Sequence, residues 1–570
     1  MDTTMERMRM MKRVLIAFSI IWCLALAGIA NAQAPAAAPA QAPAAAPAEA
    51  PAAAAPAPMM ITDADIKGVS TPKAEDKAAG DPAGTLTGTA GDIPVGDAKK
   101  GLTIGDVVST VGQNQIAINF VWTLVTGFLV MFMQAGFALV ETGLARAKNS
   151  NHTMMMNFMV YGVGMLAYWL IGFAIQEGGV GAVTNLGGTA PLNSEYTITL
   201  FGKSWGLFGQ KGMMLGGATY DVGVMVMFLF QMVFMDTALT IVTGTAAERW
   251  KYSAFLISSF IMGAFTYPLY GNWAWGGGWL ATLGSSYGLG HGYADFAGSG
   301  VVHAVGGITA LVMAIIIGPR IGKFRRDGKP NAIPGHDMVI VLAGCFILAF
   351  GWFGFNPGST LGASANGNLR ISSIAVNTML AGMAGSFSAM YYMWMRYGKP
   401  DASMTGNGLL AGLVAITAPS GFVNPTGAVI IGLVAGVLCA ISVEFLERVA
   451  KIDDVVGAVS VHGTNGIWGV IAVGLFADGK SNYGGAWNGV AGSVTGLFYG
   501  DMSQLVAQLI GVATLVGLVF SLSFVVNMII EAVWGHRVSA KTELEGLDIP
   551  EMGALGYPEF VLKPQPVMET

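Results

Sequence analysis

The stretch DFAGSGVVHAVGG (residues 295–307) places an aspartate, several small residues and a histidine in one of the most apolar parts of the chain. DDVVGAVSVHGTNG (453–466) repeats the arrangement, and in both stretches an aspartate precedes the histidine by eight residues. Ionisable side chains at membrane depth are costly and tend to mark substrate or ion pathways. His303 and His462 are therefore predicted to form a functional pair rather than two unrelated core residues.

The composition places both stretches in a membrane protein. Of the 570 residues, 53% are hydrophobic and only 11% are charged, whereas soluble proteins carry about 25% charged residues. A membrane-spanning helix needs about 20 apolar residues. Eleven stretches approach that length: 116–140, 153–176, 222–246, 252–272, 297–318, 338–357, 371–396, 403–419, 424–446, 455–476 and 503–534. The sequence therefore predicts an all-α polytopic membrane protein with eleven transmembrane helices over residues 115–535.

The charges of the loops predict an orientation. With the first span entering from outside, the cytoplasmic segments hold sixteen Lys and Arg residues and the outer loops hold four, which is the positive-inside pattern. The N-terminus is therefore expected outside and the C-terminus inside. The fifth and tenth spans then carry the histidines in from opposite faces. This indicates a five-plus-five inverted repeat with its functional site near the midplane.

The ends of the chain differ in composition from the spans. A positively charged segment, a short apolar core and an Ala-Asn-Ala triplet predict a cleaved signal peptide over residues 1–32; a first transmembrane helix is the alternative. Ala and Pro are abundant in residues 33–100, which predicts a disordered, extracytoplasmic spacer. Residues 536–570 carry mixed charge and are expected to form a cytoplasmic C-terminal tail.

The eight-residue spacing predicts how the histidines meet. Eight helical residues rise about 12 Å, so in a hydrocarbon core of about 30 Å both His303 and His462 approach the middle. At 100° per residue each aspartate lies about 80° from its histidine around the helix. Asp295 and Asp454 are therefore expected to anchor helix starts rather than to bond the imidazoles. Burial without a counterion favours neutral imidazoles, which can share one N–H bond and turn a donor or an acceptor toward a pore.

Further motifs connect the chain to a known family. They are ARAKN (145–149), FQMVF (230–234), TAAERWKYSAF (245–255), WGGG (275–278), GWFGFNPGS (351–359) and EGLDIPEMG (545–553), together with the two histidine stretches. From about residue 115 to 560 the chain resembles the ammonium transporter family (Amt/Mep/Rh). The resemblance implies eleven helices with an inverted repeat, a homotrimer in the cell inner membrane and one hydrophobic pore per subunit.

The resemblance also implies roles for single residues. Trp275, with Phe234 and Ser359, corresponds to an outer site that recruits ammonium through a cation–π contact, worth about 0.5–2 kcal/mol, and an accepted hydrogen bond. Phe230 and Phe355 correspond to a gate above the paired pore histidines. From the residues alone, a tryptophan at a span end is often an interfacial belt residue. Two phenylalanines four residues apart are by themselves ordinary core packing.

Several carboxylates are open to two interpretations. Asp295 is expected to order the outer vestibule by accepting backbone N–H bonds, and direct contact with the recruited cation is the second interpretation. Asp453 and Asp454 are expected to play the corresponding part on the inner side. Asp236, inside the third span, is either a carboxyl group satisfied by a neighbouring hydroxyl or backbone donor, or an extra titratable group beside the pore. Glu141, at the inner end of the first span, is open in the same way.

The leading functional interpretation is a transporter that recruits ammonium, removes its proton and conducts ammonia, with or without the proton, through the twin-histidine pore. Methylammonium is the expected analogue. Potassium carries the same charge but cannot shed a proton, so a dry phenylalanine gate selects against it. One alternative is an ammonium sensor with little flux. Another is a membrane redox protein with His303 and His462 as axial haem ligands, which a Soret band would support.

Few partners besides the substrate and the lipid membrane are predicted. We expect no catalytic residue, no metal site, no cofactor and no nucleic-acid binding. In the resembled family the cytoplasmic tail packs beneath the trimer, and a PII-type regulatory protein can plug the pore mouth. Here EMGALGYPEF (551–560) replaces the histidine-rich, acidic ending of some members. This departure weakens the implied PII partner.

Overall fold

The computed structural model describes residues 104–558, except 182–183, 187–190, 365–367 and 481–485. The predicted signal peptide, the Ala/Pro-rich spacer and the last twelve residues of the tail lie outside the described residues. From residue 120 onward the described residues belong to one compact unit, while 104–119 belong to a second.

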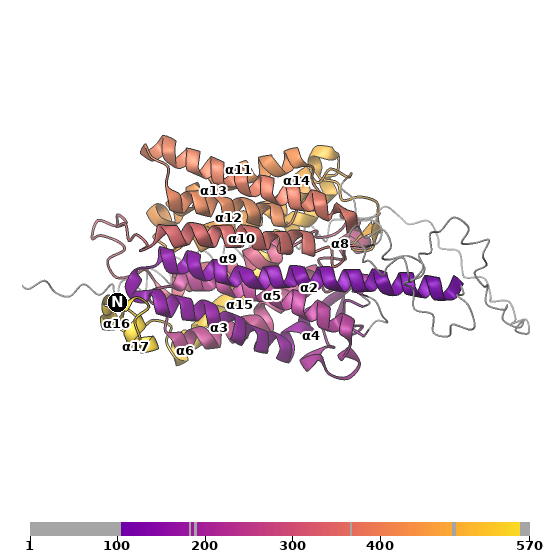
Figure 1. Ribbon diagram of the computed structural model, residues 1–570, viewed down its shortest axis with the longest axis horizontal. Coiled ribbons are helices and arrows are strands. Elements are labelled where there is room, and N and C mark those ends of the chain that lie inside the picture. Colours follow the sequence, from indigo (N-terminus) through magenta and orange to yellow (C-terminus); the bar gives the residue numbers. More distant parts are fainter. Residues whose placement is uncertain (1–103, 182–183, 187–190, 365–367, 481–485, 559–570) are drawn as a thin grey trace, which may run out of the picture. The chain divides into compact units, whose positions relative to one another are not determined.

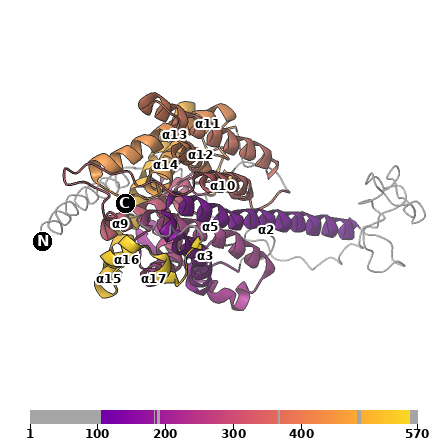
Figure 2. The ribbon, with the colours of Figure 1, turned by 60° about the vertical axis from the view of Figure 1, so that its left-hand side comes forward.

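Each apolar stretch predicted from the sequence is occupied by helix, and Figure 1 shows these helices side by side. They are α2 (Ile104–Leu144), α3, η4 and α4 (Ser150–Ala167, Tyr168–Gly172, Phe173–Glu177), α5 (Val222–Ala246), α6, η8 and α7 (Tyr252–Ile261, Met262–Thr266, Tyr267–Ala274), η9 and α9 (Ser299–Ala304, Val305–Ile317), α10 (Met338–Gly358), α11 (Ile371–Tyr397), α12 (Ala402–Thr417), α13 and η11 (Pro425–Phe445, Leu446–Ala450), η12 and α14 (Val459–Thr464, Asn465–Phe476) and α15 (Met502–Val533). The η segments named here are π-helical turns within otherwise α-helical spans. Figure 2 shows α11 and α13 gathered on the side of the bundle away from α16 and α17.

Among the described residues, nine of these helical stretches are long and apolar enough to cross a membrane. The other two are α12, with 16 residues, and α11, whose 27 residues are less apolar. The chain is therefore a mostly helical, multi-pass membrane protein. The count of eleven spans stays a prediction.

The connections contain short elements that the all-α prediction did not include. The strands β1 (Glu195–Leu200) and β2 (Lys203–Gly209) form an antiparallel hairpin after α4, and β3 (Ala486–Trp487) pairs with β4 (Val490–Ala491) before α15. The other short pieces are α8 (Leu283–Tyr287) and 3₁₀ turns at Ala147–Asn149, Thr184–Leu186, Met213–Leu215, Gly217–Thr219, Asn368–Arg370 and Leu497–Tyr499. A search for apolar runs of helix length passes over such segments, although EYTITL in β1 has the alternation typical of a strand.

Side-chain caps fix where several helices begin. The first N–H groups of a helix have no partner within the helix, and leaving them unpaired in a membrane is costly. An Asp or Asn before α5, α10, α12, α13 and α15 accepts these bonds: Asp221, Asp337, Asp401, Asn424 and Asp501. These five helices begin within one residue of their predicted positions.

The two histidine-bearing helices begin with π-helical turns, η9 and η12, and each turn is held by an aspartate. Asp295 accepts three backbone N–H bonds, each 2.9 Å long, from residues 298–301. Asp454 accepts two, of 3.0 and 2.8 Å, from residues 458–459, and a 2.7 Å bond from the Thr245 hydroxyl. The two aspartates therefore hold helix starts, and neither bonds a histidine.

The two histidine-bearing helices cross at glycines. A Cβ atom on Gly307 would lie 2.1 Å from the backbone nitrogen of Gly463. One on Gly466 would lie 2.4 Å from the carbonyl oxygen of Ser299. Backbone atoms cannot give way as a flexible side chain can, so residues without a side chain are required for this approach.

Gly307→Ala should therefore destabilise the fold, because its methyl group meets backbone. We expect a loss of about 3 kcal/mol, the upper end for overpacking in a core, seen as a lower unfolding midpoint and a smaller folded fraction after detergent extraction. Gly463→Ala is the matched control, because its Cβ would lie 3.3 Å from the nearest atom of Gly307. Equal stability of the two variants would contradict the close crossing.

An ion-pair network joins the loops at the end of the bundle that holds Asp454. Glu248 pairs with Arg146 (2.5 Å) and Arg320 (3.2 Å), and Arg320 also pairs with Asp453 (2.9 Å). Burial alone would raise the pKa of Asp453, but the guanidinium groups of Arg249 and Arg320 outweigh it and lower that pKa. Asp453 thus differs from the role expected for it: it anchors an arginine, and Asp454 alone holds the helix start.

Asp453→Asn should lower stability in a pH-dependent way. A carboxyl group whose pKa is lowered by folding contributes stability above its unfolded pKa of about 4, and that contribution is lost as the pH falls through the folded pKa. Breaking the buried pair should cost about 3 kcal/mol at pH 7, and the gap to the wild type should narrow below pH 4. Unfolding in detergent across this pH range measures it. Glu545→Gln, at an exposed site, is the control; a gap that does not change with pH would refute the assignment.

The C-terminal segment docks on the same end of the bundle. It contains α16 (Ala540–Glu545) and α17 (Asp548–Met552). Asp548 accepts the backbone N–H of His152 at 3.0 Å, and Asn149 accepts that of Leu547 at 3.0 Å. The tail is thus tied to the turn before α3, and Figure 1 shows α16 and α17 in yellow beside that turn.

Candidate functional site: a histidine pair between two cavities

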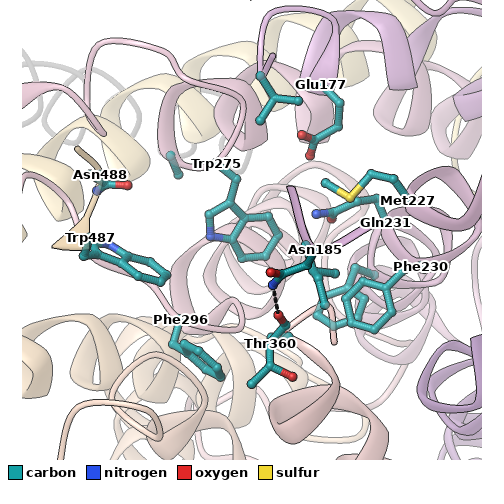
Figure 3. A pocket seen from close by; sticks show the side chains of 15 residues that line it. Glu177, Asn185, Met227, Phe230, Gln231, Trp275, Phe296, Thr360, Trp487 and Asn488 are labelled. Atoms are coloured by element: carbon teal, nitrogen blue, oxygen red, sulfur yellow. Dashed lines mark hydrogen bonds between the residues drawn. The ribbon is translucent and has the colours of Figure 1, made fainter. Parts of the chain in front are cut away.

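A cavity of about 330 Å³, which we call the Trp275 cavity, brings together four of the predicted site residues. Phe230 and Phe234 come from α5, Trp275 follows α7, and Ser359 follows α10. Figure 3 shows the Trp275 indole beside the space that Phe230, Gln231 and Glu177 also border. Segments far apart in the sequence therefore build one aromatic chamber.

Hydrogen bonds fix the polar groups of this chamber. The Trp275 Nε1–H donates to the carbonyl oxygen of Asp295 at 2.7 Å, which sets the plane of the indole. The Ser359 hydroxyl donates to the carbonyl oxygen of Phe355 at 2.8 Å, so its lone pairs stay available as acceptors. Asn185 donates to the carbonyl oxygen of Thr360 at 3.0 Å, the dashed line in Figure 3.

Phenylalanine rings separate this cavity from the histidines. The ring of Phe234 lies 4.7 Å from that of Phe230 and 4.2 Å from that of Phe355, measured between centroids. Phe355 in turn stacks on His303 at 5.2 Å. All three phenylalanines are at most 2% exposed. The route from the cavity to the imidazoles is therefore closed by rings in this structure.

His303 and His462 are in direct contact. Their Nδ1 atoms lie 3.2 Å apart, and the rings stack with centroids 5.3 Å apart. One Nδ1 must donate and the other accept, so the donor ring has a bare Nε2 and the acceptor ring an Nε2–H. His303 Nε2 has no hydrogen-bond partner within the described part of the chain. The pair therefore offers one acceptor and one donor beyond the shared bond.

Two further cavities lie on the other side of the pair. A small one, of about 20 Å³, is lined by His462, Phe137 and Glu141 among others. A larger one of about 160 Å³, which we call the Asp454 cavity, shares Asn407 and Val456 with it. Burial raises the pKa of Asp454, which lines the larger cavity. The histidines thus stand between two chambers that open toward different ends of the bundle.

The remaining predicted residues have different places. Asp295 is 1% exposed and lies behind the wall of the Trp275 cavity, where it touches backbone and Tyr293 rather than the chamber. Asp236 is 2% exposed, lines none of the three cavities, and its Oδ1 finds no donor among the described residues. Glu141 accepts from Asn157 (2.7 Å) and Thr243 (2.8 Å).

Sequence reasoning missed several residues of the Trp275 cavity. Glu177 directly follows the second apolar stretch (153–176), and Gln231 lies inside the FQMVF motif, but no sequence signal singled out either residue. Phe296 lies in the loop before η9, beside Asp295 of the opening motif, and Trp487 and Asn488 lie in the loop that holds β3 and β4; no predicted span covers either loop. Only the folded chain brings these loops to the cavity.

The geometry also bears on the haem alternative. Two axial ligands of one haem approach the iron from opposite faces, and imidazoles whose Nδ1 atoms touch do not fit that arrangement. Within the described residues no group of three or more His, Cys, Asp or Glu is placed to hold a metal ion.

Known proteins resemble this chain over most of its length. The family model of the Ammonium Transporter Family matches residues 121–557. Ammonium transporter Amt2 of Archaeoglobus fulgidus is 46% identical over 450 residues, covering 78% of this chain and 90% of that protein. Ammonium transporter Amt1 of Haloferax mediterranei is 37% identical, covering 78% and 80%.

Solved structures agree with the sequence comparisons. A sensor Amt protein is 33% identical with a TM-score of 0.66, covering 77% of this chain and 99% of that one. Mep2 of Saccharomyces cerevisiae is 26% identical with a TM-score of 0.62, covering 75% and 88%. The matched region contains both histidine stretches and the aromatic chamber. The chain therefore belongs to the ammonium transporter family.

Proposed function

We propose that this protein takes up ammonium at the Trp275 cavity, where the ion gives its proton to water, and passes ammonia along His303 and His462 to the Asp454 cavity. The observation that carries the proposal is the direct contact of the two imidazoles, at 3.2 Å, between chambers on either side. Ionisable side chains at membrane depth are costly, and those that are present tend to mark a substrate pathway. A substrate that both donates and accepts hydrogen bonds matches it.

Recruitment relies on the aromatic chamber. The Trp275 indole, turned by its bond to Asp295, offers a ring face to a small cation, and Phe234 meets it edge-on at 6.3 Å between centroids. The Ser359 oxygen supplies an acceptor for one N–H of ammonium. Asp295 acts through Trp275 and through the start of η9, not by contact with the cation.

Selectivity follows from the closed rings. Phe230 and Phe355 must move aside for any solute, and a bare ion passing between them loses its hydration without replacement. Ammonium can leave its proton behind and pass as a neutral molecule, which then donates to the bare imidazole nitrogen and accepts from the protonated one. Potassium has no such option.

The wider arrangement follows the same proposal. Eleven spans, a five-plus-five inverted repeat, an outer N-terminus and an inner C-terminus put the Trp275 cavity outside and the Asp454 cavity inside. We place the protein in the cell inner membrane as a homotrimer. A PII-type protein remains a proposed partner at the face where α16 and α17 dock.

A sensing role is the second candidate, because one of the similar solved structures is a sensor Amt protein. Flux separates the two. In proteoliposomes holding the full chain, a transporter gives a saturable current or pH change on ammonium addition, a smaller one with methylammonium and none with potassium. Ammonium binding without flux would favour the sensor.

Trp275→Leu should weaken recruitment. Loss of a cation–π contact of about 0.5–2 kcal/mol corresponds to a rise of roughly 2- to 30-fold in the half-saturating ammonium concentration. Maximal flux should change less. Trp534→Leu is the control, because that indole is 52% exposed and lies outside the cavity. An unchanged half-saturation in Trp275→Leu would remove the indole from the binding site.

The histidines should act as a unit. Replacing either His303 or His462 by Ala should abolish or strongly reduce proton-coupled ammonium flux, because each fixes the tautomer of the other. The double variant should then be no worse than the more damaging single one. Flux of all three variants, with the purified oligomer checked alongside, measures this. Effects that multiply in the double variant would show independent histidines, and normal flux in His303→Ala would end the mechanism.

A further inference from the structure

Glu177 is the one ionisable side chain among the described residues that line the Trp275 cavity. It is the last residue of α4 and is fully buried. In Figure 3 its carboxyl group points into the space beside Trp275, Met227 and Gln231. A carboxylate on this wall faces the chamber that the proposed cation occupies.

Only one of the two carboxyl oxygens of Glu177 has a hydrogen-bond donor among the described residues. Its Oε1 accepts from the Gln176 side-chain amide at 2.9 Å, whereas its Oε2 has no hydrogen-bond partner in the described part of the chain. The same amide also donates to Gln231 Oε1 at 3.3 Å, and Tyr168 donates to Gln176 Oε1 at 3.0 Å. The network holds the carboxyl group in place and leaves one oxygen for a ligand.

The β1–β2 hairpin brings a second carboxyl group to the back of this wall. Glu195 accepts from Asn272 Nδ2 at 3.1 Å through Oε2, and its Oε1 also lacks a partner among the described residues. Burial raises the pKa of Glu195 to about 7. Two carboxyl groups this close repel each other when both are ionised. A monovalent cation beside Glu177 would reduce that repulsion.

The surrounding charges do not supply that cation. The groups that face Glu177 from neighbouring elements are Glu195 and the buried phenols of Tyr168 and Tyr267. Lys211 directs its ammonium group to Asn193 at 2.7 Å. Arg370 lies over the ring of Phe296, 5.1 Å from its centroid, and does not line the chamber.

We propose that Glu177 is a cation-contacting residue of the Trp275 cavity, whose free carboxylate oxygen holds ammonium or a small alkylammonium ion against the indole. The inference rests on the proposed function in taking ammonium as the cargo. A ring face attracts a cation but accepts no conventional hydrogen bond, and ammonium has four N–H groups to satisfy. The Glu177 oxygen, with the acceptors on Gln231 and Ser359, can serve three of these four groups, and a charged acceptor is the strongest of the three.

The direct test is Glu177→Gln, which keeps the shape of the side chain and removes its charge. The half-saturating ammonium concentration for current in proteoliposomes should rise about tenfold, the loss expected for one hydrogen bond to a charged group. Asp221→Asn is the matched control: it removes one charge outside the cavity, and Asn is an equally good helix cap. If Glu177→Gln and Asp221→Asn both stay within twofold of the wild type, the inference is overturned.

A binding measurement separates this inference from the proposed function. The unfolding midpoint of the purified full chain is followed as ammonium chloride replaces sodium chloride, which reports a ligand of the folded state without any flux. The site is supported if ammonium stabilises the wild type and the Glu177→Gln variant needs about tenfold more ammonium for the same stabilisation. That result would support the site even if the wild type gave no current, an outcome that would refute transport alone. Neither stabilisation nor current in the wild type would refute both.

Glu177→Asp decides the matter if the Gln variant does not fold. It keeps the charge but draws the carboxylate back from the chamber by one methylene, so ammonium affinity should fall about threefold. Wild-type affinity in the Asp variant would overturn the contact. Methylammonium chloride, run in parallel, should follow the same order of variants.

Discussion

The backbone contact between Gly307 and Gly463 is the constraint on which the site depends. Two helices reach the middle of the bundle from opposite ends, and their histidines touch only because no side chain separates the backbones at the crossing. A methyl group on Gly307 would push the helices apart by more than the pair can bridge, since a hydrogen bond is lost within a few tenths of an ångström beyond 3.2 Å.

The aspartates connect this crossing to the chamber above it. Asp295 uses its carboxylate to hold the first turn of η9 and its carbonyl oxygen to hold the Trp275 indole. One residue thus sets both the position of His303 along its helix and the plane of the ring on which the cation is proposed to rest. Asp454 repeats the first of these tasks for His462 and binds Thr245 of α5 as well. Buried backbone N–H groups need acceptors, and here the acceptors also place the functional residues.

The buried carboxylates differ in their partners, and the differences sort their roles. Asp453 and Glu248 face guanidinium groups and hold loops together, while Glu141 accepts from an amide and a hydroxyl. Among the carboxylates of the described residues, Glu177 is the one that combines a fixed orientation, a free oxygen and a place on a cavity wall. Asp236 also has an unpaired oxygen but lines none of the described cavities, and the structure gives no reason for its presence in α5.

The sequence by itself determined the helices, their approximate bounds and the pairing of His303 with His462, because spans of apolar residues, capping residues and a repeated eight-residue spacing are local signals. Trp275, Phe230, Phe234 and Ser359 were identified by three separate motifs through their resemblance to the ammonium transporter family, and not by hydropathy or spacing. The spacing also predicted that Asp454 holds a helix start, but only the tertiary structure assigned Asp453 to Arg320, since adjacent aspartates look alike until their neighbours are in place. The hairpins, the loops that close the chamber and the free oxygen of Glu177 were likewise decided by folding. They depend on contacts between segments far apart in the chain, for which hydropathy and spacing hold no information.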